Sequence, residues 1–278
     1  MKQKKHLRYS ICSLWTFLGI CSLFISCESA PKEISFLHKI VDDSLTLSKG
    51  SKETTAKYYI DFSYVKENEG DTVATRINRE LIRKVLGMEI PLPPTEAVDL
   101  YVDDFLKEYR SDITTFYMQG NESKEDDTHA WLNYEIDIQT QTAVSRQGKV
   151  MNYVAEQSSY MGGAHPNFFA SWLNFDIQTG SRLTLESIMN PDYEQKLLEA
   201  LAYELQVKCN AESMEGVRDA GYLNWSELYV PDNFLIKDEG LLFLYNPYEI
   251  ASWSMGSTEL MLTNETLKNI LKPIEEWK

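Results

Sequence analysis

The order of hydrophobic patterns predicts an α+β fold: an antiparallel sheet with segregated helices, in two packed subdomains. Residues 57–65 alternate between apolar and polar side chains, as in a half-buried strand. Two helical patterns follow, over 72–86 and 95–110, and then a two-residue period returns for several strands. Because the later strands come in consecutive runs, the order favours separate helices and strands over alternating βαβ units.

The remaining elements are expected from turn and cap residues. The expected elements are strands over 130–139, 149–160, 168–177 and 182–185, a helix that opens at Asn190 and Pro191, a hairpin over 234–245, a strand over 258–262, and a helix that Thr263 caps and that ends before Pro273.

Length and composition indicate a folded chain. Its 278 residues are 43% hydrophobic, which supplies a core and excludes wholesale disorder. No repeat of fixed period is visible, which argues against solenoids and propellers. We divide the chain into a lipoprotein signal peptide (1–26), a tether (27–54), an N-terminal α+β subdomain (55–150) and a C-terminal α+β subdomain (151–278).

The first residues have the pattern of a secretory signal. A basic start is followed by an uncharged, mostly apolar run over 11–25, which is shorter than the ~20 residues of a spanning helix. The run ends in Leu23-Phe24-Ile25-Ser26-Cys27, which resembles the lipobox of bacterial lipoproteins, although Phe24 stands where Leu is usual. We therefore expect lipidation of Cys27 and a membrane-anchored lipoprotein that faces the periplasm or the cell exterior. Cleavage after Ala30, or retention of the run as a short anchor, are the alternatives.

The charge balance limits the partners. The chain has 27 basic and 42 acidic residues and a net charge of −15. Loss of residues 1–26 would leave 23 basic residues and a net charge of −19, so the lipid would have to supply membrane attachment. Nucleic acid is excluded as a partner, because phosphate contacts need clustered Lys and Arg. Such a surface would instead attract a basic protein.

The loop between the strands at 149–160 and 168–177 is the strongest candidate site. It reads Tyr160-Met161-Gly162-Gly163-Ala164-His165-Pro166. Two glycines permit positive φ or a close approach of the backbone, and the residue before a proline avoids helix. The loop could therefore present an imidazole to a ligand, or it could be a tight connection whose histidine bonds to the backbone.

This loop carries a resemblance to a known family. The stretch Tyr160–Pro166, the turn Asn174-Phe-Asp-Ile-Gln-Thr-Gly180 and the following Leu183-Thr-Leu185 resemble the sheet of the PdaC/RsiV-like superfamily. Asn246-Pro-Tyr-Glu-Ile-Ala251, with Gly256 and Glu259, is similar to the tyrosine-containing segment of that family, and the helix that bears Asn78 fits its N-terminal part. The resemblance covers roughly residues 55–271.

The resemblance implies an extracytoplasmic α+β module without established catalytic residues. The family includes a lysozyme-sensing anti-sigma factor and the non-catalytic N-terminal part of a peptidoglycan deacetylase. Only the sensing half is expected to carry over here, because only ten residues precede the apolar run, too few for a cytoplasmic segment that binds a sigma factor. The ligand-binding candidates are Tyr160, Gly162, Gly163, His165, Pro166 and Tyr248.

An enzyme is the weaker interpretation. After the signal the chain keeps His38, His129 and His165, and neither HExxH nor HxxxH spacing occurs. No Gly-x-Ser-x-Gly elbow or P-loop is present, so we expect no cofactor and no metal. Cys209, the one cysteine left after Cys27, cannot form an intrachain disulfide and is expected to be buried and inert.

The aromatic residues are expected mainly to pack the core and the sheet faces; they include Trp131, Tyr153, Trp172, Trp225 and Trp253. The leading hypothesis is thus a lipid-anchored envelope module that binds or senses a cell-wall (peptidoglycan) fragment or a basic wall-degrading protein such as lysozyme. The alternatives are a peptidoglycan hydrolase or deacetylase with a site near His165, and a structural subunit without a small ligand.

Overall fold

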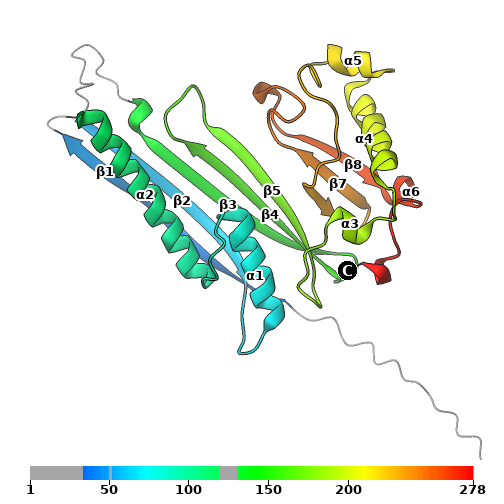
Figure 1. Cartoon of the computed structure of the whole chain (residues 1–278), viewed down its shortest axis with the longest axis horizontal. Helices are drawn as coiled ribbons and strands as arrows, with labels where there is room; N and C mark the ends of the chain where they lie inside the picture. The colour runs from blue at the N-terminus through cyan, green and yellow to red at the C-terminus, as the bar shows by residue number, and fades with distance from the viewer. Residues whose placement is uncertain (1–33, 50–51, 119–129, 278) are drawn as a thin grey trace, which may run out of the picture. The chain divides into compact units, whose positions relative to one another are not determined.

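The computed structural model describes residues 34–49, 52–118 and 130–277 (Figure 1). The predicted signal peptide, the lipidation site Cys27, the acidic segment 119–128 and His129 lie outside the described residues. The described residues belong to one compact unit, Pro31–Lys278. No helix among them is long and apolar enough to cross a bilayer.

The described residues form two sheets with helices, which confirms the predicted α+β class and its two packed subdomains. The elements are β1 (Phe36–Lys49), β2 (Lys52–Val65), α1 (Thr72–Val85), α2 (Pro94–Met118), η1 (Ala130–Leu132), β3 (Tyr134–Ser145), β4 (Val150–Tyr160), β5 (Asn167–Asp176), α3 (Leu185–Ile188), α4 (Glu194–Cys209), α5 (Met214–Asp219), β6 (Phe234–Ile236), β7 (Gly240–Tyr245), η2 (Trp253–Met255), β8 (Thr258–Thr263), α6 (Asn264–Leu267) and η3 (Ile274–Glu276).

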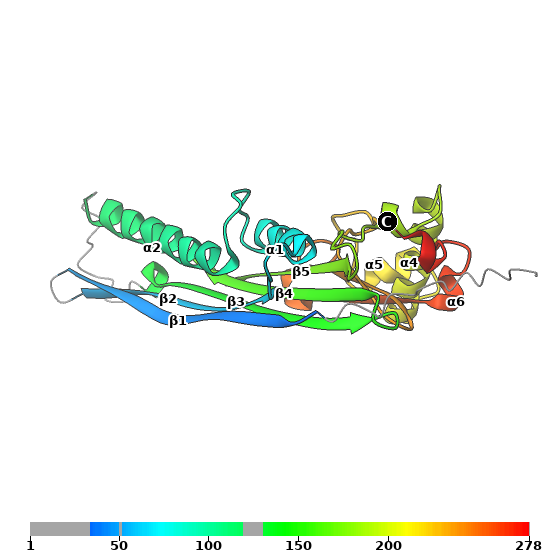
Figure 2. The same ribbon diagram turned by 90° about the horizontal axis from the view of Figure 1, so that it is seen from below.

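The larger sheet has the order β1-β2-β3-β4-β5. Neighbouring strands are antiparallel except β2 and β3, which are parallel. Helices α1 and α2 form the connection between these two strands and cover one face of the sheet (Figure 2). The alternation in β2 explains the arrangement, since Ile60 and Phe62 point into the core beneath the helices while Tyr59 and Asp61 point to the other face.

Helix α1 is fixed at its N-terminal end and at its middle. The side chain of Asp71 accepts hydrogen bonds from the main-chain N–H groups of Val73 and Ala74, which caps the helix. The buried side chain of Asn78 both accepts from the N–H and donates to the C=O of Val65, at 2.8 Å each. The last residue of β2 is thereby bonded to the middle of the helix that follows it.

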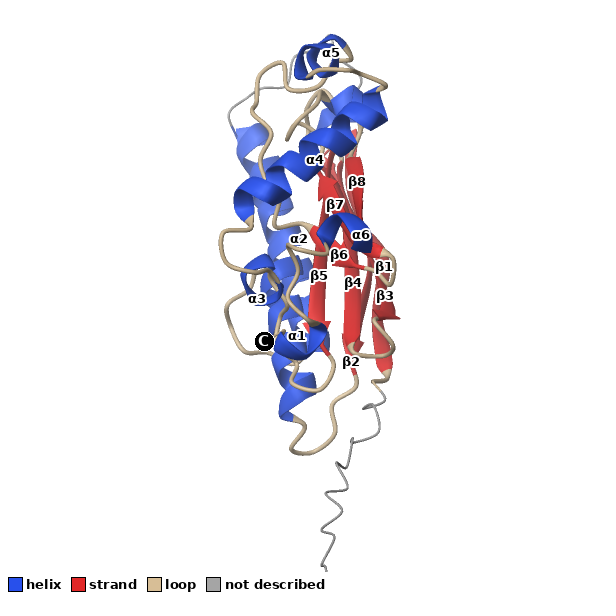
Figure 3. Ribbon diagram, turned by 90° about the vertical axis from the view of Figure 1, so that its right-hand side faces the viewer, coloured by secondary structure: helices blue, strands red, loops and turns tan. Residues whose placement is uncertain are grey.

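The smaller sheet, β6-β7-β8, is apolar on both of its faces. One face packs against α4, whose Leu197, Leu201 and Leu205 are fully buried. On the other face Leu242 and Leu244 of β7 meet Trp172 of β5. Burial on two faces explains why β7 has a continuous apolar sequence. In Figure 3 the helices lie mainly to one side of the strands.

Asparagine side chains join the two sheets, and we call Asn152, Asn174, Asn233 and Asn246 the asparagine seam. Asn174 donates to the carbonyl of Phe234 and accepts from the N–H of Ile236 and from the amide of Asn152. Asn233 and Asn246 bond to the outer edge of β5 at residues 170 and 172. Side chains therefore satisfy the edge of β5 at residues 170 and 172, while the main chain of residues 181 and 183 bonds to residues 176 and 174.

The predicted tether over 27–54 is wrong for residues 36–49. These residues form β1, which pairs with β2 residue by residue from Phe36↔Val65 to Lys49↔Lys52. Only one side of β1 packs on the core, through residues such as Val41 and Leu45, and it does so partially. The strand therefore has a polar composition that is also typical of a linker.

The predicted division at residue 150 is also corrected. It falls between β3 and β4, which are paired neighbours in one sheet. Residues up to Ile177 pack mainly in the first core, and those from Leu183 onward pack in the second. The subdomains therefore meet after β5.

Four local predictions differ from the structure. Residues 182–185 make only one bridge, Phe175↔Arg182, before α3 begins. Helix α4 starts at Glu194, because Asn190 donates instead to the carbonyl of Leu271. Thr263 caps α6 as predicted, but this helix ends at Leu267. Helix α2 runs eight residues past its predicted end, to Met118.

Candidate functional site

The loop between β4 and β5 is held by one glycine that no other residue could replace without strain. Gly162 has φ +79°, and a Cβ at this position would lie 2.5 Å from the main-chain oxygen of Trp131. The loop can therefore lie directly on η1 only with glycine at this position. The next glycine, Gly163, has open space around it, and its carbonyl accepts a hydrogen bond of 3.1 Å from the hydroxyl of Tyr160.

A strained turn after β7 presents the second half of the site. The N–H of Glu249 donates to the carbonyl of Asn246, with Pro247 and Tyr248 between them. Tyr248 has φ +73°, at the position where a type II turn normally places glycine. A bulky residue in this region costs about 1–3 kcal/mol and persists only where its surroundings impose it. The carboxylate of Glu249 contributes by accepting from the N–H of Asn246 at 2.7 Å.

His165 connects the loop to the turn. Its Nδ1 lies 2.8 Å from the carbonyl oxygen of Pro166, and its Nε2 lies 3.0 Å from the hydroxyl of Tyr248. A carbonyl can only accept, so Nδ1 carries the proton. In the neutral ring Nε2 therefore accepts the hydroxyl proton of Tyr248.

Trp253 completes the group of rings. Its ring stacks on that of His165, with the centroids 4.3 Å apart and the planes 25° from parallel. Trp253 is 37% exposed and Tyr248 is 56% exposed, so both rings are open to a partner. We call His165, Tyr248 and Trp253 the His165 cluster. It joins the β4–β5 loop to the segment between β7 and β8, which lie about 80 residues apart in the sequence.

The structure thus brings the predicted site residues together. His165 contacts both Pro166 and Tyr248, while Tyr160, Gly162 and Gly163 shape the loop. The residue that sequence reasoning missed is Trp253, which was assigned to packing. Tyr153 and Trp172 are buried as expected. The rings of Trp131, Trp225 and Trp253 are more exposed, although Trp131 packs edge-on against Phe116.

The partners of His165 and the nearby titratable groups define the chemistry of the cluster. Both nitrogens of His165 bond to uncharged oxygen atoms, so the ring lacks the carboxylate that orients a catalytic histidine in a triad. Within the described residues no group of three or more His, Cys, Asp or Glu is placed to hold a metal ion. Cys209 is half-buried, and burial raises the pKa of its thiol, which favours the unreactive protonated form.

The face of the larger sheet opposite α1 and α2 carries many carboxylates. Cross-strand pairing places Asp42, Tyr59 and Asp137 in one row, and Asp61, Gln139 and Glu156 in the next. A third row runs from Lys57 through Glu135 to Tyr160, which leads to the β4–β5 loop. We call this surface the acidic face. A pocket of about 300 Å³ lies within it, next to Asp42 and Asp137.

Comparison with known proteins places this architecture in context. Residues 186–265 match the model of a family described as "Protein of unknown function (DUF3298)". The match includes β6, β7 and Tyr248, whereas His165 lies before it. The search of curated proteins gave no match.

Two solved DUF3298 structures are similar to the chain. A DUF3298 family member from Bacteroides fragilis NCTC 9343 is 24% identical, with a TM-score of 0.80, over 88% of this chain and 96% of that one. A DUF3298 family protein from Pseudomonas aeruginosa PAO1 is 14% identical, with a TM-score of 0.56, over 87% and 96%. These likenesses support the fold across both sheets.

Proposed function

We propose that this protein is a lipid-anchored module of the cell envelope that binds or senses a cell-wall fragment or a basic wall-degrading protein such as lysozyme. The observation that carries the proposal is the His165 cluster, an exposed stack of rings that a strained turn holds in place. The module acts by binding, and its ligand contacts Tyr248 and Trp253.

Exposed rings of this kind suit a cell-wall glycan. Tyr and Trp present an apolar face together with a polar tip, so they can stack on a sugar ring and also donate a hydrogen bond. The same residue types dominate the energy of protein–protein contacts when they are held rigidly. The backbone strain at Tyr248 supports a role for this ring, because strained residues gather at functional sites.

The acidic face suits the second type of ligand. Carboxylates from four adjacent strands point to the same side, on a chain of net charge −15. Such a surface speeds the approach of a basic protein, and the rate falls as salt is added. Because Tyr160 continues the rows of this face, a protein bound there would also reach the β4–β5 loop.

Binding of the full chain, in a mild detergent, to muropeptides and to lysozyme tests the proposal. We expect Trp253→Ala to weaken muropeptide binding at least tenfold. Trp225→Ala is the matched control, since Trp225 is 67% exposed but lies outside the cluster. The double variant Asp42→Asn, Asp137→Asn should weaken lysozyme binding and reduce its salt dependence. The absence of micromolar binding to both ligands at low salt would contradict the proposal.

The membrane anchor forms a separate part of the proposal. It rests on Ser26-Cys27 after the apolar run. Mass spectrometry of the protein from its native membrane should show loss of residues 1–26 and acylation of Cys27. An unmodified Cys27 with the leader attached would contradict the anchor, while leaving the binding surface to be judged by its own test.

The alternative is an envelope hydrolase or deacetylase that uses His165. One observation favours an enzyme: the hydroxyl of Tyr248 donates a hydrogen bond to Nε2 of His165, and a Tyr–His pair could relay a proton in catalysis. Incubation of the protein with peptidoglycan, followed by analysis of released sugars and acetate, separates the two functions. We expect no turnover; turnover that His165→Ala abolishes without loss of folding would establish the enzyme.

A further inference from the structure

A basic pocket lies beside the turn that joins β3 to β4. Its volume is about 610 Å³, and its lining includes Arg146, Lys149, Lys272 and Trp277. Three cationic side chains at one pocket stand out on a chain of net charge −15. Asp238 and Glu275 also line the pocket, so their arrangement decides whether the positive charge is neutralised.

The guanidinium of Arg146 has only uncharged hydrogen-bond partners. Its Nη1 donates to the carbonyl of Asp238 at 3.3 Å, and its Nη2 donates to the side-chain oxygen of Asn264 at 2.8 Å. Its Nε is shielded from solvent and has no hydrogen-bond partner among the described residues. Burial lowers the pKa of Arg146, because the charged guanidinium is less stable away from water than in it. A partly buried guanidinium without a carboxylate partner is a group that an anion would stabilise.

Asp238 and Glu239 attract the guanidinium of Arg146 through space, but the hydrogen bonds of the described residues join it to uncharged oxygen atoms. The carboxylate of Asp238 accepts from the main-chain N–H of Arg146 at 2.6 Å. Glu275 is 72% exposed and approaches Lys149 only to 4.0 Å. Lys272 donates to the main-chain carbonyls of residues 186 and 187 at 3.0 and 3.2 Å, so its charge also lacks a carboxylate partner.

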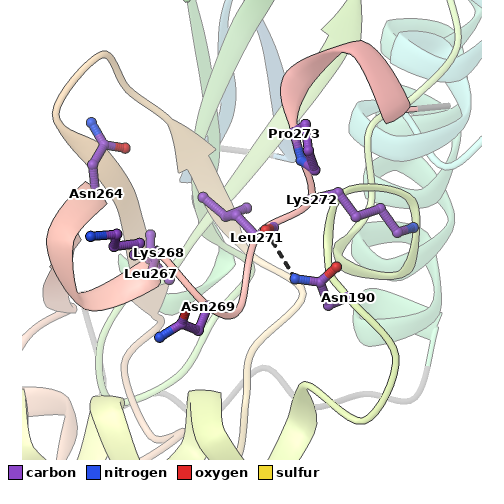
Figure 4. Close-up of a pocket in the computed structure, with 8 residues that line it drawn as sticks. All are labelled: Asn190, Asn264, Leu267, Lys268, Asn269, Leu271, Lys272 and Pro273. Carbon is purple, nitrogen blue, oxygen red and sulfur yellow. Dashed lines mark hydrogen bonds between the residues drawn. The ribbon is translucent and has the colours of Figure 1, made fainter.

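A second pocket next to the first one is also lined by basic side chains, Lys268 and Lys272. It has a volume of about 500 Å³ and shares Leu271 and Lys272 with the first pocket (Figure 4). Figure 4 shows Lys268 and Lys272 pointing away from each other, with asparagine amides around them. Its lining contains no Asp or Glu, and its Asn264 is the residue that holds Arg146.

Backbone strain marks the same turn. Arg146 and Gln147 have φ of 52° and 57°, a region that side-chain-bearing residues seldom occupy. The ring of Trp277 lies over the guanidinium, with 5.9 Å between Cζ and the ring centroid, and gives the pocket an apolar wall. The site thus combines fixed positive charge with a ring surface.

We infer that the pocket between Arg146, Lys149 and Trp277 binds the phosphate or carboxylate group of a small organic ligand. Coulomb attraction to the three cations would hold the oxyanion, and Trp277 would contact the body of the molecule. This site is separate from the His165 cluster and does not depend on the function proposed for that cluster.

Calorimetric titration of the full chain tests the inference with two matched pairs of probes. Glycerol 1-phosphate is compared with glycerol, and D-glucuronate is compared with D-glucose, so that the two sources of the oxyanion are separated. We expect at least one anionic probe to bind, more weakly as NaCl is raised, while the neutral probes do not. Lys149→Met should weaken this binding about tenfold, and Lys107→Met, the same change on the exposed side of α2, should leave it unaltered.

Two variants, Arg146→Met and Lys149→Met, remove a positive charge from the pocket with different consequences for the fold. Arg146→Met removes the central charge, but it also removes bonds to residues 238 and 264, so urea unfolding must accompany it. Lys149 makes one long ion pair, 4.0 Å from the exposed Glu275, so its replacement tests the charge with little effect on the fold. Equal binding of neutral and anionic probes, no binding of either anion at millimolar concentration, or unchanged binding in Lys149→Met would each overturn the inference.

Discussion

The asparagine seam and the His165 cluster both join the larger sheet to the smaller one, but under opposite conditions. In the seam Asn152 and Asn174 are at most 2% exposed, and their amides bond to the main chain or to each other. In the cluster the rings of Tyr248 and Trp253 are open to solvent and are held by one hydrogen bond and one stack. The polar residues of the seam therefore stabilise the fold, whereas those of the cluster leave a surface that a partner can reach.

The comparison separates two roles within the motifs that resemble the PdaC/RsiV-like superfamily. The asparagines of those motifs, Asn78, Asn174 and Asn246, are all buried and bond to main-chain groups. His165 and Tyr248 come from the same motifs but face solvent or lie near it. Loss of a seam residue should therefore lower the free energy of unfolding, whereas loss of a cluster residue should spare the fold and weaken binding.

Asn174→Ala, in the seam, should have the largest effect on the free energy of unfolding. It leaves the carbonyl of Phe234 and the N–H of Ile236 without their partner, and it removes one of the two hydrogen bonds that the amide of Asn152 donates. At about 1–3 kcal/mol for each buried unsatisfied group, we expect the free energy of unfolding to fall by about 3 kcal/mol or more. Urea denaturation measures the change. Asn167→Ala, at the exposed end of the same strand, should stay within about 0.5 kcal/mol; equal effects of the two variants would contradict the role of the seam.

Gly162→Ala should have the next largest effect. The new Cβ would meet the carbonyl of Trp131, and φ of +79° is unfavourable for alanine. We expect a loss of about 2 kcal/mol in unfolding free energy, with displacement of the His165 loop. Gly163→Ala is the matched control, because nothing lies within 4 Å of its added Cβ. A Gly162 variant as stable as the Gly163 variant would mean that the close approach to η1 is unimportant.

Tyr248→Phe, in the His165 cluster, should leave the free energy of unfolding nearly unchanged, in contrast to the variants of the asparagine seam. The hydroxyl makes an exposed hydrogen bond to Nε2 of His165, and such a bond contributes at most about 0.5–1 kcal/mol. Chemical denaturation should show a change of that size or less, while muropeptide binding falls severalfold. A destabilisation as large as that of Asn174→Ala would show instead that the cluster supports the fold.

Tyr134→Phe should give the smallest effect, confined to alkaline solution. Burial, together with the hydrogen bond that Tyr134 donates to Asp112, raises the pKa of this tyrosine to about 12. Since the folded pKa lies above the unfolded value of 10.0, its contribution to stability is complete below pH 10 and is lost as the pH rises towards 12. The urea midpoint of the wild type should therefore fall more steeply than that of the variant over this interval. If the urea midpoints of the wild type and of Tyr134→Phe fell in parallel with pH, the raised pKa of Tyr134 would be contradicted.

Sequence periodicity was sufficient for the elements whose two sides differ in polarity. Strand β2 and helix α1 alternate clearly, because one side packs and the other is solvated. Strand β1 was missed, since its outward side carries Asp42 and its inward side is only half-buried. The helix cap expected at Asn190 failed because a tertiary bond to residue 271 competes for that side chain.

The candidate site could be predicted in part for similar reasons. Glycines and a histidine before proline mark the β4–β5 loop in the sequence itself, and the resemblance added Tyr248. The stack of Trp253 on His165 depends on the positive φ of Tyr248 and on how two distant segments meet, and neither leaves a local pattern. The basic pocket was missed because its lysines and arginine are scattered along the chain.

The parallel pairing of β2 with β3 affects how the chain reaches its fold. The hairpin of β1 and β2 can form from adjacent residues, but its inner edge pairs with a strand that begins only at Tyr134. Ribosomes add roughly 5–20 residues per second, so that edge stays open for several seconds during synthesis. An open strand edge readily recruits other chains, and this early hairpin is therefore where a chaperone would be needed most.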